Sequence, residues 1–499
     1  MAESENDVRQ KQRQSKERIE QAILHLAKTS PRDFTADDVR VALGDTVLND
    51  PDFRSEMMGG AFSALSQRNL IKSIGSRTSQ YPGMKNRRVT VYAATDNLTA
   101  AKPAPSGGQT NLVGSTANAL NFIQAAHLFA QSIGFICEIP DLANFFLSLQ
   151  AKPFIILSGI SGTGKSLLPK IFADLLGADF ISIPVKPNWN ENSYLMGYYS
   201  VSHDDFTVGP MTSAILNAAK NPSMPTIVRL DEMNLAHVEH YFSDLLSIME
   251  NRRREDGHVL TDPVPLDLPS SFISSTKEKE AKLARLRELQ MPWNLFVIGT
   301  VNVDETTHPF SRKVLDRSFA IEFSNVDLGA FSPAGTAAVP IDGEKYRPLL
   351  LDRPLSIHEV YSSDQEFFQE IAGRLQEVNS ILATVELHFG YRVRDEICLY
   401  MYAWKRHALE PVMTHDEALD FCIMQKVLPR CHGTSEASRR AIEQIFMVAA
   451  GGEPRPDLDL DRADVDYPLP GRRYRRTAEK TSRMLRQYRE TGYFSFWNS

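Results

Sequence analysis

A glycine-rich segment that ends in a lysine and a serine offers the clearest chemistry in this sequence. Residues 159–166 fit the pattern G-x-x-x-x-G-K-S, with an apolar run before them and a helical pattern beginning near Leu167. Glycines let backbone N–H groups turn toward phosphates, and the start of a helix adds a favourable dipole. The lysine would reach the β- and γ-phosphates of a nucleotide, and the serine hydroxyl would bind Mg²⁺. The segment therefore predicts a site for a nucleoside triphosphate with Mg²⁺, formed by Gly159, Ser161, Gly162, Thr163, Gly164, Lys165 and Ser166.

Two acidic residues follow a second apolar run, at 227–230. Acids that follow a strand are commonly just solvated residues at its end. Here, however, the first acid comes 66 residues after Lys165, and the run before it belongs to the same series of apolar runs, which favours a functional role. We expect Asp231 to hold the Mg²⁺ sphere and Glu232 to orient and deprotonate the attacking water. Arg229, inside the run, is unusual for a buried strand.

A third apolar run, at 295–298, is followed after three further residues by an asparagine, Asn302. Alone, Asn302 would be read as an ordinary turn residue. Beside the first two motifs, its amide is predicted to hold the attacking water and the γ-phosphate.

The elements that would position these residues form a regular alternation. Short apolar runs separated by helical patterns indicate a parallel sheet covered by helices on both faces. We therefore predict an α/β P-loop module over residues 117–330 and a helical lid domain over 331–499. The runs lie at 154–157, 180–185, 227–230, 295–298 and 319–323.

The N-terminal residues 1–95 have a different pattern, in which three short helices precede two strands at 70–74 and 88–92. This order predicts a winged helix-turn-helix domain, and the Ala-, Pro- and Gly-rich residues 96–116 predict a linker. Residues 53–95 carry seven basic residues and one acid, whereas residues 1–52 carry eight basic residues and eleven acids. The excess of positive charge favours DNA contact through 53–95, with protein docking as the alternative.

Several short motifs of this chain resemble the AAA+ superfamily and, within it, the McrB-like motor subunits of modification-dependent restriction systems. The resemblance extends over residues 117–499. Its marks, besides the three motifs above, lie at 187–189, 197–198, 231–234, 240–244, 299–302, 388–392 and 425–429.

The resemblance implies a ring-forming nucleotide hydrolase, expected to be a hexamer, with Asn302 as the sensor 1 residue. It makes Arg317 the arginine finger offered to a neighbour's nucleotide, with Arg312 as the alternative. Arg392 corresponds to the sensor 2 arginine of the lid. The resemblance also implies a McrC-like nuclease as a separate partner subunit.

One departure leaves the nucleotide open. The family signature reads Met-Asn-Thr-Ala-Asp, whereas residues 301–305 read Val-Asn-Val-Asp-Glu. McrB is a GTPase, and no Asn-Lys-x-Asp guanine-binding sequence compensates for the departure. The substrate is therefore GTP or ATP.

Composition excludes several other classes of protein. The 499 residues carry a net charge of −7, so a nucleic-acid site must be a local patch. Four scattered cysteines predict neither a disulfide framework nor a zinc site, and no apolar run reaches the ~18 residues that span a bilayer. A charged N-terminal segment is unlike a signal peptide, and together these features predict a cytoplasmic protein without a membrane contact.

Two other functions fit parts of the sequence. A MoxR-type chaperone ATPase would use the same motor to remodel proteins, but would not need a DNA-binding N-terminal domain. A nucleotide-sensing DNA-binding regulator would use the loop without turnover, but would need neither Glu232 nor Arg317.

Overall fold

The computed structural model divides the chain into two compact units, Met1–Val113 and Gly114–Ser499. In the first unit it describes three strands and four isolated positions. In the second it describes residues 118–255, 258–269, 277–303, 308–323, 329, 343–354, 356–453 and 473–498.

The first unit contains an antiparallel sheet in the order β1-β3-β2, formed by β1 (Phe34–Thr35), β2 (Ile71–Thr78) and β3 (Arg88–Ala94). The predicted hairpin is thus present, with longer strands than expected, and β1 was not predicted. Four buried helical positions, Ile19, Ile23, Val39 and Phe62, are described. The rest of the predicted helices lies outside the described residues, so the winged helix-turn-helix stays a prediction.

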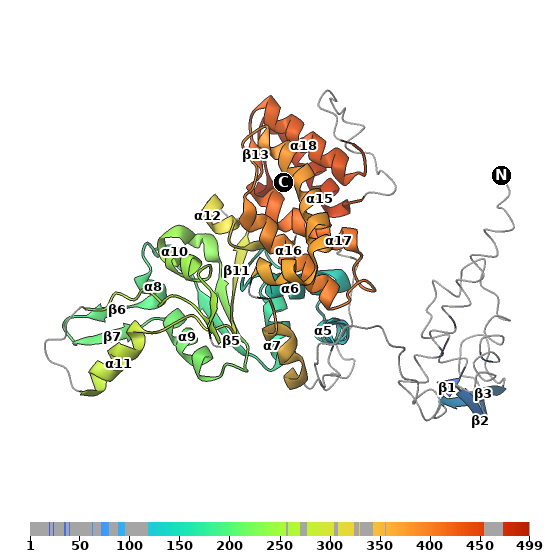
Figure 1. Cartoon of the computed structure of the whole chain (residues 1–499), viewed down its shortest axis with the longest axis horizontal. Helices are drawn as coiled ribbons and strands as arrows, with labels where there is room; N and C mark the ends of the chain where they lie inside the picture. Colours follow the sequence, from blue (N-terminus) through green and yellow to red (C-terminus); the bar gives the residue numbers. More distant parts are fainter. Residues whose placement is uncertain are drawn as a thin grey trace. The chain divides into compact units, whose positions relative to one another are not determined.

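The second unit (Figure 1) is built on a parallel five-stranded sheet. The order of its strands is β12-β4-β11-β8-β5. Every predicted run became one of its strands, which confirms the α/β P-loop fold. All six residues of β4 are buried, whereas only Ile183 of the edge strand β5 is buried. The strands are β4 (Phe154–Gly159), β5 (Asp179–Pro184), β8 (Thr226–Asp231), β11 (Leu295–Asn302) and β12 (Phe319–Phe323).

Helices cover both faces of this sheet, because successive side chains of a strand point to opposite sides. Ile155 and Leu157 of β4 pack into one hydrophobic cluster, and Phe154 and Ile156 pack into the other. The first cluster includes α5 (Ala119–Ser132), α6 (Ile139–Ala151) and α7 (Leu167–Leu176); the second includes α8 (Ser193–Met196), α9 (Pro210–Lys220), α10 (Val238–Ile248), part of α11 (Lys277–Arg287) and α12 (Arg312–Leu315).

Two short hairpins extend the module and were not predicted from the sequence. One is formed by β6 (Gly197–Ser200) and β7 (Asp205–Val208), the other by β9 (Arg253–Glu255) and β10 (His258–Leu260). Figure 1 shows β6, β7 and α11 at the end of the unit that lies away from the C-terminal helices. Lys282 of α11 forms an ion pair with Asp205 of β7 at 2.8 Å.

The C-terminal part forms the predicted helical lid. Its elements are η2 (Gly343–Tyr346), α13 (Arg347–Leu351), α14 (Ile357–Ser363), α15 (Gln365–Ala383), α16 (Tyr391–Arg406), α17 (His415–Cys422), η3 (Ile423–Val427), η4 (Leu428–Arg430), β13 (His432–Gly433), α18 (Glu436–Ala449), α20 (Arg475–Thr491), β14 (Phe494–Ser495) and η5 (Phe496–Asn498). Of the helices in the described residues, none is long and apolar enough to cross a membrane.

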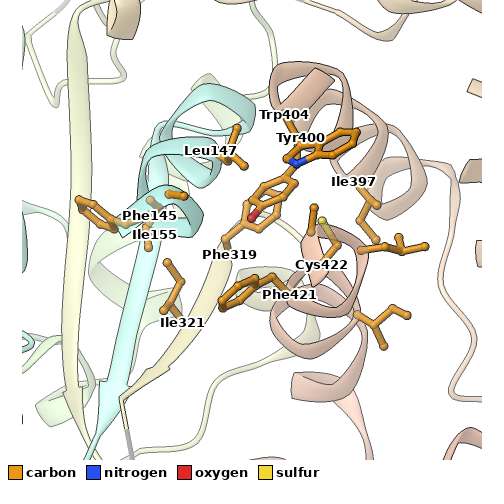
Figure 2. Close-up of a cluster of buried hydrophobic side chains, with 14 of the residues drawn as sticks. Phe145, Leu147, Ile155, Phe319, Ile321, Ile397, Tyr400, Trp404, Phe421 and Cys422 are labelled. Atoms are coloured by element: carbon orange, nitrogen blue, oxygen red, sulfur yellow. The ribbon is translucent and has the colours of Figure 1, made fainter. Parts of the chain in front are cut away.

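The lid shares a hydrophobic core with the sheet. Figure 2 shows Phe319 and Ile321 of β12 facing Tyr400 and Phe421 of the lid. The phenol of buried Tyr400 also donates a hydrogen bond to Asn144 of α6, at 2.8 Å. Because buried aromatic contacts of this kind stabilise an interface strongly, lid and sheet are expected to move as closely coupled parts.

Candidate nucleotide-binding site

The phosphate-binding loop, residues 159–166, connects β4 to α7 as the sequence predicts. Two of its glycines are required by close approaches as well as by their left-handed backbone. At Gly159 (φ +147°) a Cβ atom would lie 2.0 Å from the carbonyl oxygen of Phe323, and at Gly164 (φ +90°) 2.2 Å from the ring of Phe135. A larger residue at Gly159 would therefore collide with the backbone of β12, and one at Gly164 would force the ring of Phe135 to move.

Lys165 is 5% exposed and folds back along the loop. Its Nζ donates to the carbonyl oxygens of Gly159 at 2.8 Å and Ile160 at 2.5 Å. Thr163 donates to the same Ile160 carbonyl at 3.0 Å, while the side chain of Ser161 lies at the surface. The ammonium group is thus held at the loop, where a triphosphate would replace carbonyl oxygens as its partner.

Asp231 lies at the centre of the expected Mg²⁺ site. Its Oδ1 accepts hydrogen bonds from the hydroxyls of Ser166, at 3.2 Å, and Thr300, at 2.8 Å. Hydroxyl and carboxylate oxygens are the ligands that Mg²⁺ prefers, and it usually takes only one or two carboxylates beside the substrate phosphates. The Ser166 hydroxyl and the Asp231 carboxylate are donors of this kind, so they fit a Mg²⁺ ion that arrives with a nucleotide. The described residues contain no cluster of three or more His, Cys, Asp or Glu side chains suited to a metal.

Arg229, which looked out of place in a buried strand, has a structural explanation. Its guanidinium donates to the Ser166 carbonyl and to the Ser182 hydroxyl, both at 2.9 Å, and to Asp231 Oδ2 at 3.2 Å. It thereby ties the end of the phosphate-binding loop to β5 and β8. Only its position inside an apolar run could have drawn attention to it in the sequence.

Glu232 occupies a left-handed backbone conformation, with φ 52° and ψ 51°. This conformation costs energy for a residue other than glycine and is common at functional sites. The Glu232 amide donates to Thr300 Oγ1 at 3.2 Å, and its exposed carboxylate accepts from Asn302 Nδ2 at 3.4 Å. The structure thus brings the predicted base and the predicted sensor 1 residue together. Thr300, which contacts both acids, was not singled out from the sequence.

The two predicted arginines meet on a single carboxylate. Arg317 Nη2 lies 2.8 Å from Glu250 Oε2, and Arg392 Nε lies 2.9 Å from Glu250 Oε1. Glu250, just after α10, has a side chain that is only 16% exposed. Arg312, the alternative finger, is exposed at the first residue of α12. Sequence reasoning missed Glu250 because nothing in an acid at a helix end indicates partners 67 and 142 residues away.

Comparisons with known proteins match two segments of the chain. Residues 154–317 match the family described as "AAA domain (dynein-related subfamily)", and residues 351–494 match a domain of unknown function, DUF8727. A solved structure from Cytophaga hutchinsonii, described as a "putative ATPase", aligns with a TM-score of 0.35 and 14% identity, covering 62% of this chain and 88% of that chain. No curated protein matches the chain.

Replacement of the expected base tests the assignment of roles at this site. Glu232→Gln keeps the shape of the side chain but removes its ability to take a proton. We expect nucleotide affinity to stay unchanged while phosphate release falls by about 100-fold or more. Fluorescent-nucleotide titration and a phosphate-release assay measure the two quantities, with Lys165→Ala as the variant that loses binding itself. Wild-type turnover in Glu232→Gln would show that another group activates the water.

Proposed function

We propose that this chain, whose residues 154–317 form an AAA+ nucleoside-triphosphatase domain of the dynein-related subfamily, is a McrB-like motor that acts on DNA. It would hydrolyse GTP or ATP as a ring, most simply a hexamer, and drive a McrC-like nuclease in antiphage restriction. The observation that carries the hydrolase part is the cluster of Ser166, Asp231, Thr300, Glu232 and Asn302 at the ends of three adjacent strands.

Each residue has a distinct task in this proposal. Lys165 binds the β- and γ-phosphates, and Ser166 and Asp231 hold the Mg²⁺ ion, which neutralises charge on the phosphate oxygens. Glu232 orients the water and accepts its proton. Asn302, whose amide nitrogen lies 3.4 Å from the Glu232 carboxylate, holds the attacking water and the γ-phosphate. Positioning and charge stabilisation then supply most of the catalysis.

The proposed ring follows from the role given to Arg317. Its guanidinium lies on Glu250 and on the carbonyl oxygen of Lys313, at 3.0 Å, rather than on its own phosphate-binding loop. A finger of this kind stabilises the charge of a neighbour's γ-phosphate in the transition state. Turnover would therefore need two subunits at each site, which is the reason for a ring.

DNA binding is assigned to the first unit. Its hairpin, β2 and β3, lies within the basic residues 53–95, and Arg88 begins β3. Lys85 and Arg87 fall just before it in the sequence. A basic hairpin suits contact with phosphates rather than readout of particular bases. This feature favours the DNA motor over a chaperone that remodels proteins.

Charge reversal in the hairpin tests the DNA assignment. Changing Lys85, Arg87 and Arg88 together to Glu should weaken DNA binding by about tenfold or more at moderate salt and flatten its salt dependence, because each lost phosphate contact lowers the slope by about 1. Basal hydrolysis should be unaffected. Fluorescence anisotropy with duplex DNA over a series of salt concentrations measures both effects.

The matched control places the same kind of reversal on the second unit. Arg440 and Arg475 are more than half exposed there, and Arg440→Glu with Arg475→Glu should leave DNA affinity nearly unchanged. If the hairpin variant binds DNA as the wild type does, residues 1–95 dock a protein instead.

A second test concerns the division of labour. The chain has groups for hydrolysis, whereas the nuclease would belong to a partner, so the purified chain should not cut DNA. A McrC-like partner encoded beside it should raise phosphate release, because docking can order the interfaces where Arg317 meets a γ-phosphate. Co-purification, phosphate release and DNA integrity on gels measure these effects. DNA cleavage by the single chain that a mutation within it abolishes would contradict the proposal, and a lack of stimulation by any neighbour-encoded protein would favour the chaperone.

A further inference from the structure

The turn that carries Arg317 is held by the lid. Residues 316–318 connect α12 to β12, and Arg317 lies in their middle. Lys426 Nζ, from η3 of the lid, donates to the carbonyl oxygens of Ser318 at 2.7 Å and Asp316 at 3.1 Å. One ammonium group therefore forms hydrogen bonds with the residues on both sides of Arg317.

Burial of the Lys426 ammonium group costs desolvation free energy, which its partners offset. Its side chain is 0% exposed, and it pairs with Glu396 Oε2 at 2.5 Å. Lys152, just before β4, pairs with the other oxygen of Glu396, also at 2.5 Å. Burial lowers the pKa of Lys426, while the nearby Glu396 carboxylate opposes that change. A buried ammonium needs such partners, and its remaining donors are directed at the turn.

A second lid side chain holds the same turn. Arg430, whose side chain is 5% exposed, forms an ion pair with the Asp316 carboxylate. Lys426 and Arg430 come from a π-helical turn and the 3₁₀ turn that follows it, η3 and η4. π-Helical turns often occur at functional sites, because they redirect side chains that a regular helix would place elsewhere. This is the segment 425–429 that the resemblance marked without giving it a role.

We propose that Lys426 is a positioning residue for the arginine finger. The lid of one subunit would then fix the position of the Arg317 side chain that enters the nucleotide site of the neighbouring subunit. The inference rests on the proposed role of Arg317. Glu396, the buried partner of Lys426, lies one helical turn after Arg392 on α16. Arg392 itself pairs with Glu250, the carboxylate that also holds Arg317, so a further side chain of the lid reaches the finger.

Rings assembled from two variants can show in which subunit a change at Lys426 lowers hydrolysis. An acceptor chain, Arg317→Ala, keeps its nucleotide site but offers no finger. A donor chain, Lys165→Ala, offers a finger but binds no nucleotide. Equal amounts of the two should recover hydrolysis at the interfaces where donor meets acceptor. Lys426→Met is then placed on the donor alone or on the acceptor alone.

The expected result is asymmetric. On the donor, Lys426→Met should lower the recovered rate by about tenfold or more, since a displacement of about 1 Å in a catalytic group is that costly. On the acceptor, the rate should change by less than about twofold, because the P-loop and its acids do not contact Lys426. Nucleotide affinity of Lys426→Met should equal that of the wild type. Lys405→Met, a half-exposed lid lysine paired with Asp364, is the matched control and should have no effect in either position.

The possible failures are distinguishable. If donor and acceptor recover no activity before Lys426 is changed, the finger acts within its own chain, and the proposed ring chemistry and this inference both fall. If they recover activity but Lys426→Met has equal effects in both positions, or none on the donor, only the inference is overturned. Should Lys426→Met fail to fold, the triple variant Lys152→Met/Glu396→Gln/Lys426→Met removes all three charges of the cluster, leaves none of them unpaired and should show the same asymmetry.

Discussion

The nucleotide site depends on the carboxylate of Asp231, which joins three neighbouring strands at one edge of the sheet. Its Oδ1 accepts hydrogen bonds from Ser166, after β4, and from Thr300 of β11, while Oδ2 faces Arg229 of its own strand. Parallel pairing brings the carboxyl ends of these strands together, so residues far apart in sequence meet without any long loop. The register of the sheet therefore decides whether the site exists.

The same sheet connects the site to the lid. On its β12 side, Lys426 and Arg430 hold the turn before the strand, and Lys480 of α20, with a side chain 1% exposed, pairs with Glu322 at 3.0 Å. Buried ion pairs of this kind add little net stability but are strongly destabilising when one partner is lost. They therefore favour one defined placement of lid against sheet. A rigid placement suits a protein in which the arginines of lid and core are proposed to contact nucleotide phosphates at defined positions.

The sequence allowed much of this fold to be predicted, for physical reasons. Four of the five strands are largely buried, and the edge strand β5 still carries apolar residues, so apolar runs indicated all five. The glycine-rich motif after β4 pointed to Ser166, and the acids after the run of β8 pointed to Asp231. The hairpins β6–β7 and β9–β10 were missed because short, exposed strands have no apolar pattern. The contacts of Arg229 and Glu250 were missed because they join residues that only the fold brings together. The trans role of Arg317 stays a prediction, since it concerns a second subunit.

The central claim is that hydrolysis occurs at a site completed by a neighbouring chain. The most direct measurement is the specific rate of phosphate release of the wild-type protein over a wide range of concentrations, with the oligomeric state determined at each one. A shared site predicts a specific rate that rises with protein concentration, in step with the assembled fraction. A specific rate that stays constant down to a demonstrably monomeric sample would contradict the account.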